Sequence, residues 1–232
     1  MIYQMGALWK YLFSGSCAPA LNMAIDEALL WNVVGLGCPV LRFYSWTEPA
    51  ATFGYSQKFE EVARWTQLRP LLRRPTGGGV VPHLSDWTYA IAIPPGNPWY
   101  SLSADLSYQR LHGWMQKAFT RLGIHTELAP MPRQGPPGQC FVGADQHDLL
   151  WEGRKIAGAA QRRKHLGLLI QGSVQFQPMQ IERHSWEQAL LEVAALNWDV
   201  KWEEISLDPQ TTGLAVQLAA NKYSTNEYNQ RR

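Results

Sequence analysis

The chain has few cysteines and no long apolar segment, and these two features exclude several classes of protein. Three cysteines, Cys17, Cys38 and Cys140, cannot close a disulfide framework, and no two of them have the spacing of zinc ligands. Residues 1–9 lack the basic stretch and apolar run of a secretion signal. No stretch approaches the roughly 18 uncharged apolar residues that a membrane span needs. These features predict a cytoplasmic protein that does not enter a membrane.

An excess of charge of one sign is also lacking. The 21 Lys and Arg residues minus the 19 Asp and Glu residues leave a net charge of only +2. A dedicated nucleic-acid binder usually carries a clear basic excess, so we expect no nucleic-acid partner. With 46% hydrophobic and 17% charged residues, the chain is too apolar to stay unfolded. Its 232 residues predict a single domain, 1–232, and its eleven tryptophans indicate a thick core or an apolar cleft.

Helix and strand patterns alternate along the chain, which predicts an α/β (α+β) fold. Residues 103–122 have the clearest helical period, with Ser103 as N-cap and Gly123 just past the end. In residues 88–93, Tyr89, Ile91 and Ile93 alternate with small residues, as in a strand. The other expected helices are 22–33, a helix through 196 that Ser185 and Gln188 open as a capping box, and one after 208. The other expected strands are 40–46 and 166–176, and residues 149–156 are expected to form a strand–turn–strand.

The segment 73–79, Arg-Arg-Pro-Thr-Gly-Gly-Gly, is the strongest motif. Three consecutive glycines stabilise neither a helix nor a strand, but they let a ligand approach the backbone closely. The spacing matches neither the Walker A loop nor the dinucleotide-binding fingerprint. His83 follows this segment within a few residues. We interpret the run as a ligand-binding loop, with a plain flexible turn as the alternative.

A second motif, Gly-Arg-Lys-Ile-Ala-Gly-Ala-Ala-Gln, occupies residues 153–161. Lys155 sits in a hairpin-like element beside the small residues Gly158 and Ala159. Small residues leave room for an extended ligand, and a lysine there can bind a phosphate or a carbonyl oxygen. The alternative is an ordinary solvated lysine.

Cys140 follows the Pro- and Gly-rich loop 129–139, which distinguishes it from a cysteine in an apolar run. A loop position near a cation favours the thiolate and makes a nucleophile, although a small buried apolar role stays open. The six histidines are scattered without zinc-enzyme spacing, so we expect no metal. Asp86 and Asp148 are isolated, and we interpret them as turn or cap residues.

Together these motifs resemble the lipoate–protein ligase and octanoyltransferase superfamily. The resemblance extends to residues 20–30, which look like the first helix of that family, and to 42–57, which look like its first hairpin. Residues 222–229 resemble its C-terminal signature, so nearly the whole chain is covered. The implied fold is the biotin/lipoate ligase catalytic domain, a mixed sheet flanked by helices. Because few residues follow position 176, we expect no separate C-terminal accessory domain like that of a full ligase.

The segment around Cys140 is similar to that of the cysteine-dependent octanoyltransferases. This resemblance implies that Cys140 is the nucleophile and that Lys155 assists it. It implies transfer of octanoyl from octanoyl–acyl carrier protein to a lysine of a lipoyl domain, on the glycine cleavage H protein or a dehydrogenase E2 subunit, without a cofactor. The expected substrate-binding residues are Arg74, Thr76, Gly77, Gly78, Gly79, His83, Gly158 and Ala159.

Two alternatives stay open. The first is a lipoate–protein ligase that uses ATP and Mg²⁺ to form a lipoyl-adenylate, with Lys155 on the phosphate. The second is an inactive homologue that only binds an acyl or lipoyl carrier. Leu84 follows His83 where ligases commonly have an aspartate, which counts against the ligase more than against the transferase. Gln171 stands where the family resemblance implies a histidine, which leaves the inactive homologue open.

Overall fold

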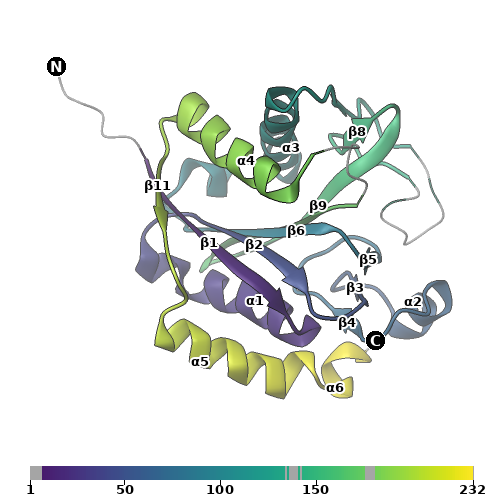
Figure 1. Ribbon diagram of the computed structural model, residues 1–232. Coiled ribbons are helices and arrows are strands. Elements are labelled where there is room, and N and C mark those ends of the chain that lie inside the picture. Colours follow the sequence, from purple (N-terminus) through teal and green to yellow (C-terminus); the bar gives the residue numbers. More distant parts are fainter. Residues whose placement is uncertain (1–6, 134, 136–140, 142, 176–180, 232) are drawn as a thin grey trace.

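The computed structural model describes residues 7–133, 135, 141, 143–175 and 181–231 (Figure 1). In chain order the elements are β1 (Leu8–Cys17), α1 (Pro19–Leu36), β2 (Val40–Trp46), β3 (Ala50–Phe53), α2 (Phe59–Trp65), β4 (Leu71–Arg73), β5 (Val81–His83), β6 (Trp87–Ile93), η1 (Pro98–Ser101), α3 (Ala104–Arg121), β7 (Glu127–Leu128), β8 (Leu149–Trp151), β9 (Arg154–Lys164), β10 (Gly167–Val174), α4 (Arg183–Trp198), β11 (Lys201–Glu204), α5 (Pro209–Leu218), η2 (Ala219–Tyr223) and α6 (Asn226–Asn229).

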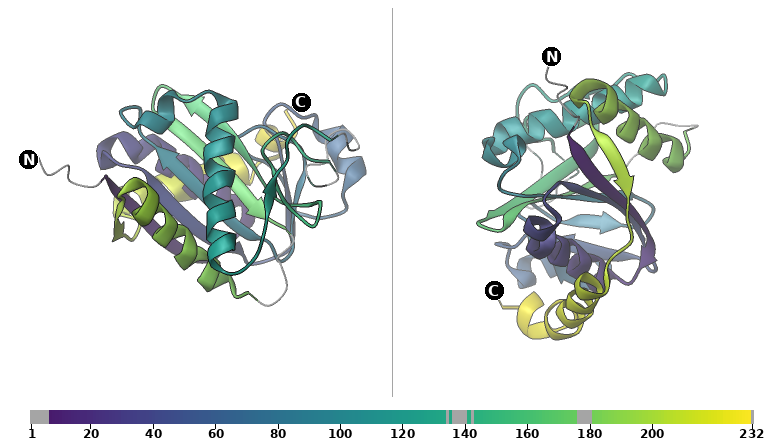
Figure 2. Two further views of the ribbon diagram at one scale, coloured as in Figure 1. Left: turned by 90° about the horizontal axis from the view of Figure 1, so that it is seen from above. Right: turned by 90° about the vertical axis from the view of Figure 1, so that its left-hand side faces the viewer.

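Within the described residues, these strands form two sheets. The main sheet has eight strands in the order β11-β1-β2-β6-β10-β9-β8-β7, and the small sheet has three in the order β4-β3-β5. The pairs β1–β11, β1–β2 and β3–β4 are parallel, whereas the other pairs are antiparallel. Helices α3 and α4 cover one face of the main sheet, and α1 and α5 cover the other (Figures 1 and 2). The expected mixed sheet flanked by helices is therefore confirmed.

The alternation of side-chain size in β6 explains how the two helical layers fit. Tyr89, Ile91 and Ile93 belong to the core under α3 and α4, whereas Ala90 and Ala92 belong to the core under α1. Successive side chains of a strand point to opposite faces, so the large residues fill one layer and the small ones let α1 lie close to the sheet. The period expected from the sequence is confirmed here.

Helix α3 begins and ends where its sequence predicts. The Ser103 hydroxyl accepts a hydrogen bond from the amide of Leu106, and Gly123 has a φ of +79° just beyond the last turn. Leu111, Trp114, Met115, Ala118 and Phe119 are buried against the sheet. Leu106, in the first turn, is 48% exposed and does not belong to that core.

The capping-box prediction for α4 is wrong. The helix begins earlier, at Arg183, and no side chain caps it. The Arg183 guanidinium binds Glu187 within the first turn and donates to Ser45 and to the carbonyl of Tyr44 on β2. Contacts with a distant strand therefore set this helix start in place of a local cap.

The hairpin expected over residues 42–57 is also wrong. Its first strand, β2, pairs with β1 and β6 in the main sheet, whereas its second strand, β3, pairs with β4 and β5 in the small sheet. The chain thus crosses from one sheet to the other at residues 47–49. The sequence patterns predicted neither β1 nor β11, nor β4 and β5.

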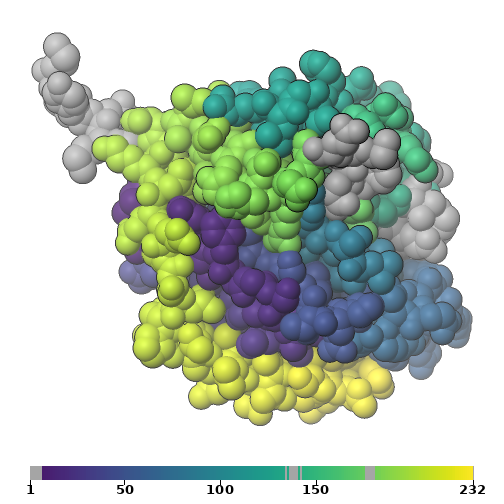
Figure 3. Space-filling view, in the orientation of Figure 1, coloured from purple at the N-terminus to yellow at the C-terminus, as the bar shows by residue number. Residues whose placement is uncertain are grey.

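The C-terminal segment returns to the first helix. Helix α5 packs on α1, and α6 lies against β4 (Figure 1). Figure 3 shows this segment, in yellow, along the lower edge of the molecule. The helix expected after residue 208 is confirmed as α5, with the Asp208 carboxylate accepting from the amide of Thr211. No helix of the described residues is long and apolar enough to cross a membrane. The single-domain organisation over 1–232 stays a prediction.

Candidate active site

The glycine segment, residues 73–79, begins at the end of β4, where Arg73, its first residue, fixes it in place. This guanidinium is fully buried and donates to the carbonyls of Tyr55 and Gln57 and to that of Asn229 in α6. The Asn229 side chain in turn accepts from the Arg73 amide at 2.8 Å. Arg73 therefore binds the C-terminal helix to the loop, and it is not exposed to a partner.

Gly78 forms the sharp turn of the segment, with a φ of +84°. Its carbonyl lies against Gly54, where an added Cβ would come within 1.9 Å of the oxygen. The amide of Tyr55 also donates to the carbonyl of Thr76 at 2.9 Å. The loop is therefore held against the turn that follows β3, and both glycines are needed for that contact.

Arg74 and Thr76 hold the loop from within. The Arg74 guanidinium donates to the carbonyl of Gly77, and its amide donates to that of Phe53. The Thr76 hydroxyl donates at 2.7 Å to the Gln171 side chain on β10. That Gln171 side chain donates in turn to Asp26 of α1 at 2.7 Å. Gln171, where the resemblance implied a histidine, thus joins the loop to α1 through the sheet.

Lys155 on β9 lies in a buried ion pair. Its Nζ is 2.6 Å from Oδ2 of Asp148, and the two side chains are only 5% and 6% exposed. Burial raises the pKa of the Asp148 carboxyl, while the Lys155 ammonium opposes that rise. The amide of Asp145 donates to the same carboxylate oxygen at 2.6 Å. The lysine is therefore positioned by a carboxylate and is no ordinary solvated side chain.

Gly158 makes room for this lysine. A Cβ at Gly158 would lie 2.7 Å from Cε and 2.9 Å from Nζ of Lys155, closer than real contacts allow. The Lys155 side chain consequently crosses its own strand over a residue that has no side chain. The small residue and the lysine of this motif are needed together.

His83 on β5 belongs to a second polar group opposite this pair. Its Nδ1 is 2.9 Å from Oδ2 of Asp86, and its Nε2 is 2.9 Å from Oγ1 of Thr52. The ring stacks on Trp46 with 3.9 Å between centroids. Burial alone raises the pKa of the Asp86 carboxyl, but His83 and two neighbouring hydroxyl groups outweigh it and lower that pKa below its usual range.

These groups surround one pocket between the small sheet and the ends of β6, β9 and β10. The residues that line it are Met23, Tyr44, Thr52, Arg74, Gly78, Val81, His83, Thr88, Phe141, Asp145, Lys155, Gly158, Ala159, Ala160, Gln171, Gly172 and Ser173.

The pocket brings most of the expected site residues together. Arg74, Gly78, His83, Lys155, Gly158 and Ala159 line it, although they come from distant parts of the chain. Thr76, Gly77 and Gly79 do not line it and belong to the frame of the loop. Cys140 lies outside the described residues. Phe141, the next residue along the chain, lines the pocket, and its ring centroid is 4.9 Å from Nζ of Lys155.

The interpretation of Asp86 and Asp148 as mere turn or cap residues is wrong, since each carboxylate pairs with an expected site residue. One local signal could have indicated the first of them, because Asp86 follows His83 by three residues. Thr52, which bonds to His83, and Ser173, which donates to Asp86 at 2.6 Å, carry no such signal, because their roles depend on strand pairing. Among the described residues, no group of three or more His, Cys, Asp or Glu side chains could hold a metal ion.

Known proteins resemble this chain in sequence and in fold. Residues 18–218 match the family model of the lipoyl protein ligase A/B catalytic domain. The octanoyltransferase LipM of Carboxydothermus hydrogenoformans is 36% identical over 172 residues, which cover 72% of this chain and 64% of that protein. The LipM of Anoxybacillus flavithermus is 33% identical over 180 residues, with 72% and 65% covered. The chain thus spans somewhat less than two thirds of the length of these relatives.

Two solved structures share the fold. Lipoate-protein ligase A bound with ATP superimposes with a TM-score of 0.76 at 19% identity, covering 97% of this chain and 99% of that one. A bi-partite lipoate protein ligase from Thermoplasma acidophilum, described with its E2 lipoyl domain, gives 0.73 at 18% identity, with 97% and 96% covered. The family match covers most of the chain, and the fold agrees with it. The chain therefore belongs to the lipoyl protein ligase A/B catalytic domain family.

Proposed function

We propose that this protein is an octanoyltransferase of protein lipoylation. It takes the octanoyl group of octanoyl–acyl carrier protein onto Cys140 and passes it to a lysine of a lipoyl domain. The family match and the relatives named octanoyltransferase support this reaction. No nucleotide is needed, because the reaction converts a thioester to an amide and runs downhill.

The proposed chemistry has two balanced steps. The Cys140 thiolate attacks the thioester carbonyl of the donor; a new carbon–sulfur bond forms, the bond to the carrier breaks, and the carrier leaves as its thiolate, which takes up a proton from solvent. The ε-amine of the acceptor lysine then attacks the octanoyl-enzyme. A carbon–nitrogen bond forms, the bond to Cys140 breaks, and one proton leaves the amine. Such a covalent route lets two protein substrates use one site in turn.

The observation that carries the proposal is the Lys155–Asp148 pair at the wall of the pocket. Both side chains are nearly buried, yet Lys155 lines the pocket together with Phe141, the neighbour of Cys140 in the chain. An ammonium held in such a place can stabilise the negative charge that develops on the acyl oxygen, because little water screens it. The Asp148 carboxylate holds the ammonium in that position.

The pocket also suits an eight-carbon chain. Its wall includes Met23, Val81, Ala159 and Ala160, which offer carbon to an alkyl chain. Seven alkyl carbons at ~0.8 kcal/mol each correspond to roughly 6 kcal/mol of burial. Gly78 of the glycine loop lines the pocket, and because it has no side chain, its backbone can lie close to the acyl group.

The acceptor that we propose is a lipoyl domain. The Thermoplasma acidophilum relative is described with an E2 lipoyl domain, which supports a partner of that type here. The glycine cleavage H protein and dehydrogenase E2 subunits are both acceptors of this class. A cytoplasmic location agrees with such partners and stays part of the proposal.

The ligase route is the competing reaction, because one structural relative of this fold binds ATP. That relative is only 19% identical and shows the fold alone. The described residues hold no cluster that fits a resident Mg²⁺, and the buried carboxylates Asp148 and Asp86 are already paired with Lys155 and His83. We therefore derive no step through a nucleotide or a metal, and a measurement of the intact mass separates the two routes.

Intact-mass spectrometry tests the proposal. The protein is mixed with octanoyl–acyl carrier protein without ATP, and the mass is expected to rise by one octanoyl group that hydroxylamine removes. Cys140→Ala should show no gain, while Cys17→Ala and Cys38→Ala serve as matched controls and should gain the group. A protein that gains nothing, but lipoylates a lipoyl domain with ATP, Mg²⁺ and lipoate, would be a ligase. Binding of the carrier with no transfer under either condition would identify an inactive homologue.

A further inference from the structure

Acceptor aminolysis needs a proton acceptor, because a lysine amine is an ammonium ion at neutral pH and must lose a second proton when the amide forms. We propose that His83 is that acceptor, positioned by Asp86 and reached through the Thr52 hydroxyl, and that this group acts in the transfer step and not in the acylation of Cys140. The inference rests on the proposed octanoyltransferase function.

The hydrogen bonds around His83 assign its neutral tautomer. Arg74 donates to the Thr52 oxygen at 3.4 Å, so the Thr52 hydroxyl hydrogen is directed toward Nε2 of His83. Nε2 therefore carries a lone pair, and Nδ1 carries the hydrogen that it donates to Asp86. A lone pair that faces a pocket-lining hydroxyl is what a general base requires.

Asp86 is arranged to stabilise the imidazolium that would form. Its Oδ2 accepts from His83, from Thr88 at 2.9 Å and from Ser173 at 2.6 Å. Its Oδ1 is buried and has no hydrogen-bond partner within the described residues. The carboxylate thus keeps its charge next to the ring, which is the orienting role that an aspartate plays beside a catalytic histidine.

The ring of His83 is also held in place. It stacks on Trp46 at 3.9 Å and is only 4% exposed, so its edge cannot turn away from Thr52 and Asp86. The Trp46 indole donates to Thr88, which itself donates to Asp86. Such a fixed array needs little rearrangement when a proton arrives.

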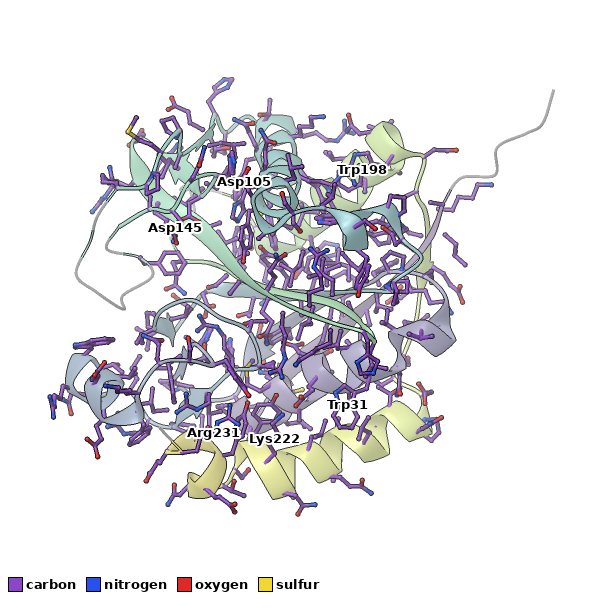
Figure 4. The ribbon with its side chains drawn as sticks, turned by 180° about the vertical axis from the view of Figure 1, so that it is seen from behind. Trp31, Asp105, Asp145, Trp198, Lys222 and Arg231 are labelled. Carbon is purple, nitrogen blue, oxygen red and sulfur yellow. The ribbon has the colours of Figure 1, made fainter. Side chains whose placement is uncertain are left out.

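The other titratable groups of the described pocket wall are Tyr44, Arg74, Asp145 and Lys155. Arg74 is a permanent cation, and Lys155 is the cation of an ion pair with Asp148. Burial raises the pKa of Tyr44 well above its ordinary value, and its hydroxyl already donates to a buried carboxylate. Asp145 is exposed and lies on the loop before β8 (Figure 4).

The proton balance follows from this arrangement. The acceptor ammonium first loses one proton to solvent and becomes the free amine. As the carbon–nitrogen bond forms, the second proton passes from the amine to the Thr52 oxygen while the Thr52 hydroxyl proton passes to Nε2 of His83. The bond between the acyl carbon and Cys140 breaks, and Cys140 is released as its thiolate. His83 then gives its proton to solvent, which restores the starting state.

The test measures the two half-reactions separately. His83→Gln should form the octanoyl-enzyme at a rate within about threefold of the parent. It should transfer octanoyl to the lipoyl-domain lysine at least about 100-fold more slowly, with the half-saturating acceptor concentration unchanged. Hydroxylamine, which brings an uncharged amine, should discharge both octanoyl-enzymes at similar rates. His165→Gln replaces an exposed histidine outside the pocket and is the matched control.

Transfer by His83→Gln at the parental rate would overturn the inference, and so would an equal loss in acylation and in hydroxylamine discharge. Asp86→Asn and Thr52→Val provide independent variants should His83→Gln fail to fold, and both should show the same selective loss in transfer. A parent protein that never acquires the octanoyl group would remove the proposed function, and this inference with it. Parental transfer by His83→Gln would refute only the role of His83, because the octanoyl-enzyme still forms. Absence of the octanoyl-enzyme in the parent would refute the proposed function itself, so the two failures are distinguishable.

Discussion

His112 gives the sharpest quantitative prediction for stability. It lies on α3 in the core, only 1% exposed, and burial lowers its pKa from 6.5 to about 3. The backbone of His147 opposes this change, while the charge of Lys155 adds to it. Asp105 lies on the same helix, α3 (Figure 4), and its Oδ1 is 3.0 Å from Nε2 of His147 on the loop before β8.

The sign follows from proton binding. The unfolded chain protonates His112 below about pH 6.5, whereas the folded chain keeps it neutral down to about pH 3. Stability conferred by the neutral form is therefore complete above the unfolded pKa and declines as the pH falls. One proton changes the free energy of unfolding by about 1.4 kcal/mol per pH unit. Between pH 7 and pH 4.5 the expected loss is therefore about 2.5 kcal/mol.

Urea unfolding of the parent and of His112→Leu across this pH range measures the effect. The leucine variant cannot bind the proton, so its stability should decline less steeply, by about 2.5 kcal/mol over the interval. The difference between the two curves isolates His112 from the carboxylates, which both proteins share. Parallel curves would refute the reasoning, because they would show that the folded and unfolded chains protonate this site alike.

Three further substitutions test the frame of the pocket. Gly158→Ala should slow octanoyl transfer at least about tenfold in a mass-spectrometric assay, because its Cβ would lie 2.7 Å from Cε of Lys155 and 3.3 Å from Oδ1 of Asp148 and would displace the ammonium from its buried position. Gly172→Ala should lower the free energy of unfolding by about 3 kcal/mol, measured in urea, because its Cβ would lie 2.0 Å from the hydroxyl of a buried tyrosine. Asp26→Ala should cost about 3–5 kcal/mol in the same assay, because it leaves the Arg42 guanidinium buried without its partner at 2.6 Å; a loss below about 1 kcal/mol would contradict that account.

Local patterns predicted the elements whose signals are complete within a short window. Helix α3 carries its own N-cap at Ser103 and its own stop at Gly123, and the strands β2 and β6 have β-forming residues with the right period. The fold class followed from their alternation. The predicted start of α4 is wrong because the helix begins at Arg183, whose guanidinium binds β2. Ser45 and Tyr44 of β2 lie far from Arg183 in the sequence, so no short window contains this contact.

The site was predicted in part for the same reason. Lys155 with Gly158 and the run at 73–79 are contiguous motifs, so their residue types and spacing are enough to indicate them. The residues that position these motifs carry no such local signal. The sequence indicates only a turn residue at Asp148, whereas in the structure its Oδ2 is 2.6 Å from Nζ of Lys155. Thr52 reaches His83 only because β3 pairs with β5.

Residue types at fixed short spacings were sufficient for the class of fold, the glycine loop, the lysine motif and the family. Other features depend on the folded arrangement: which loop glycine lines the pocket, and the link that Gln171 makes between the loop and Asp26 of α1. The pairing of one carboxylate with Lys155 and another with His83 belongs to the same group. Strand pairing and burial select these partners from the many that the chain offers, and because the partners lie mostly far apart in the sequence, no short window contains both members of a pair.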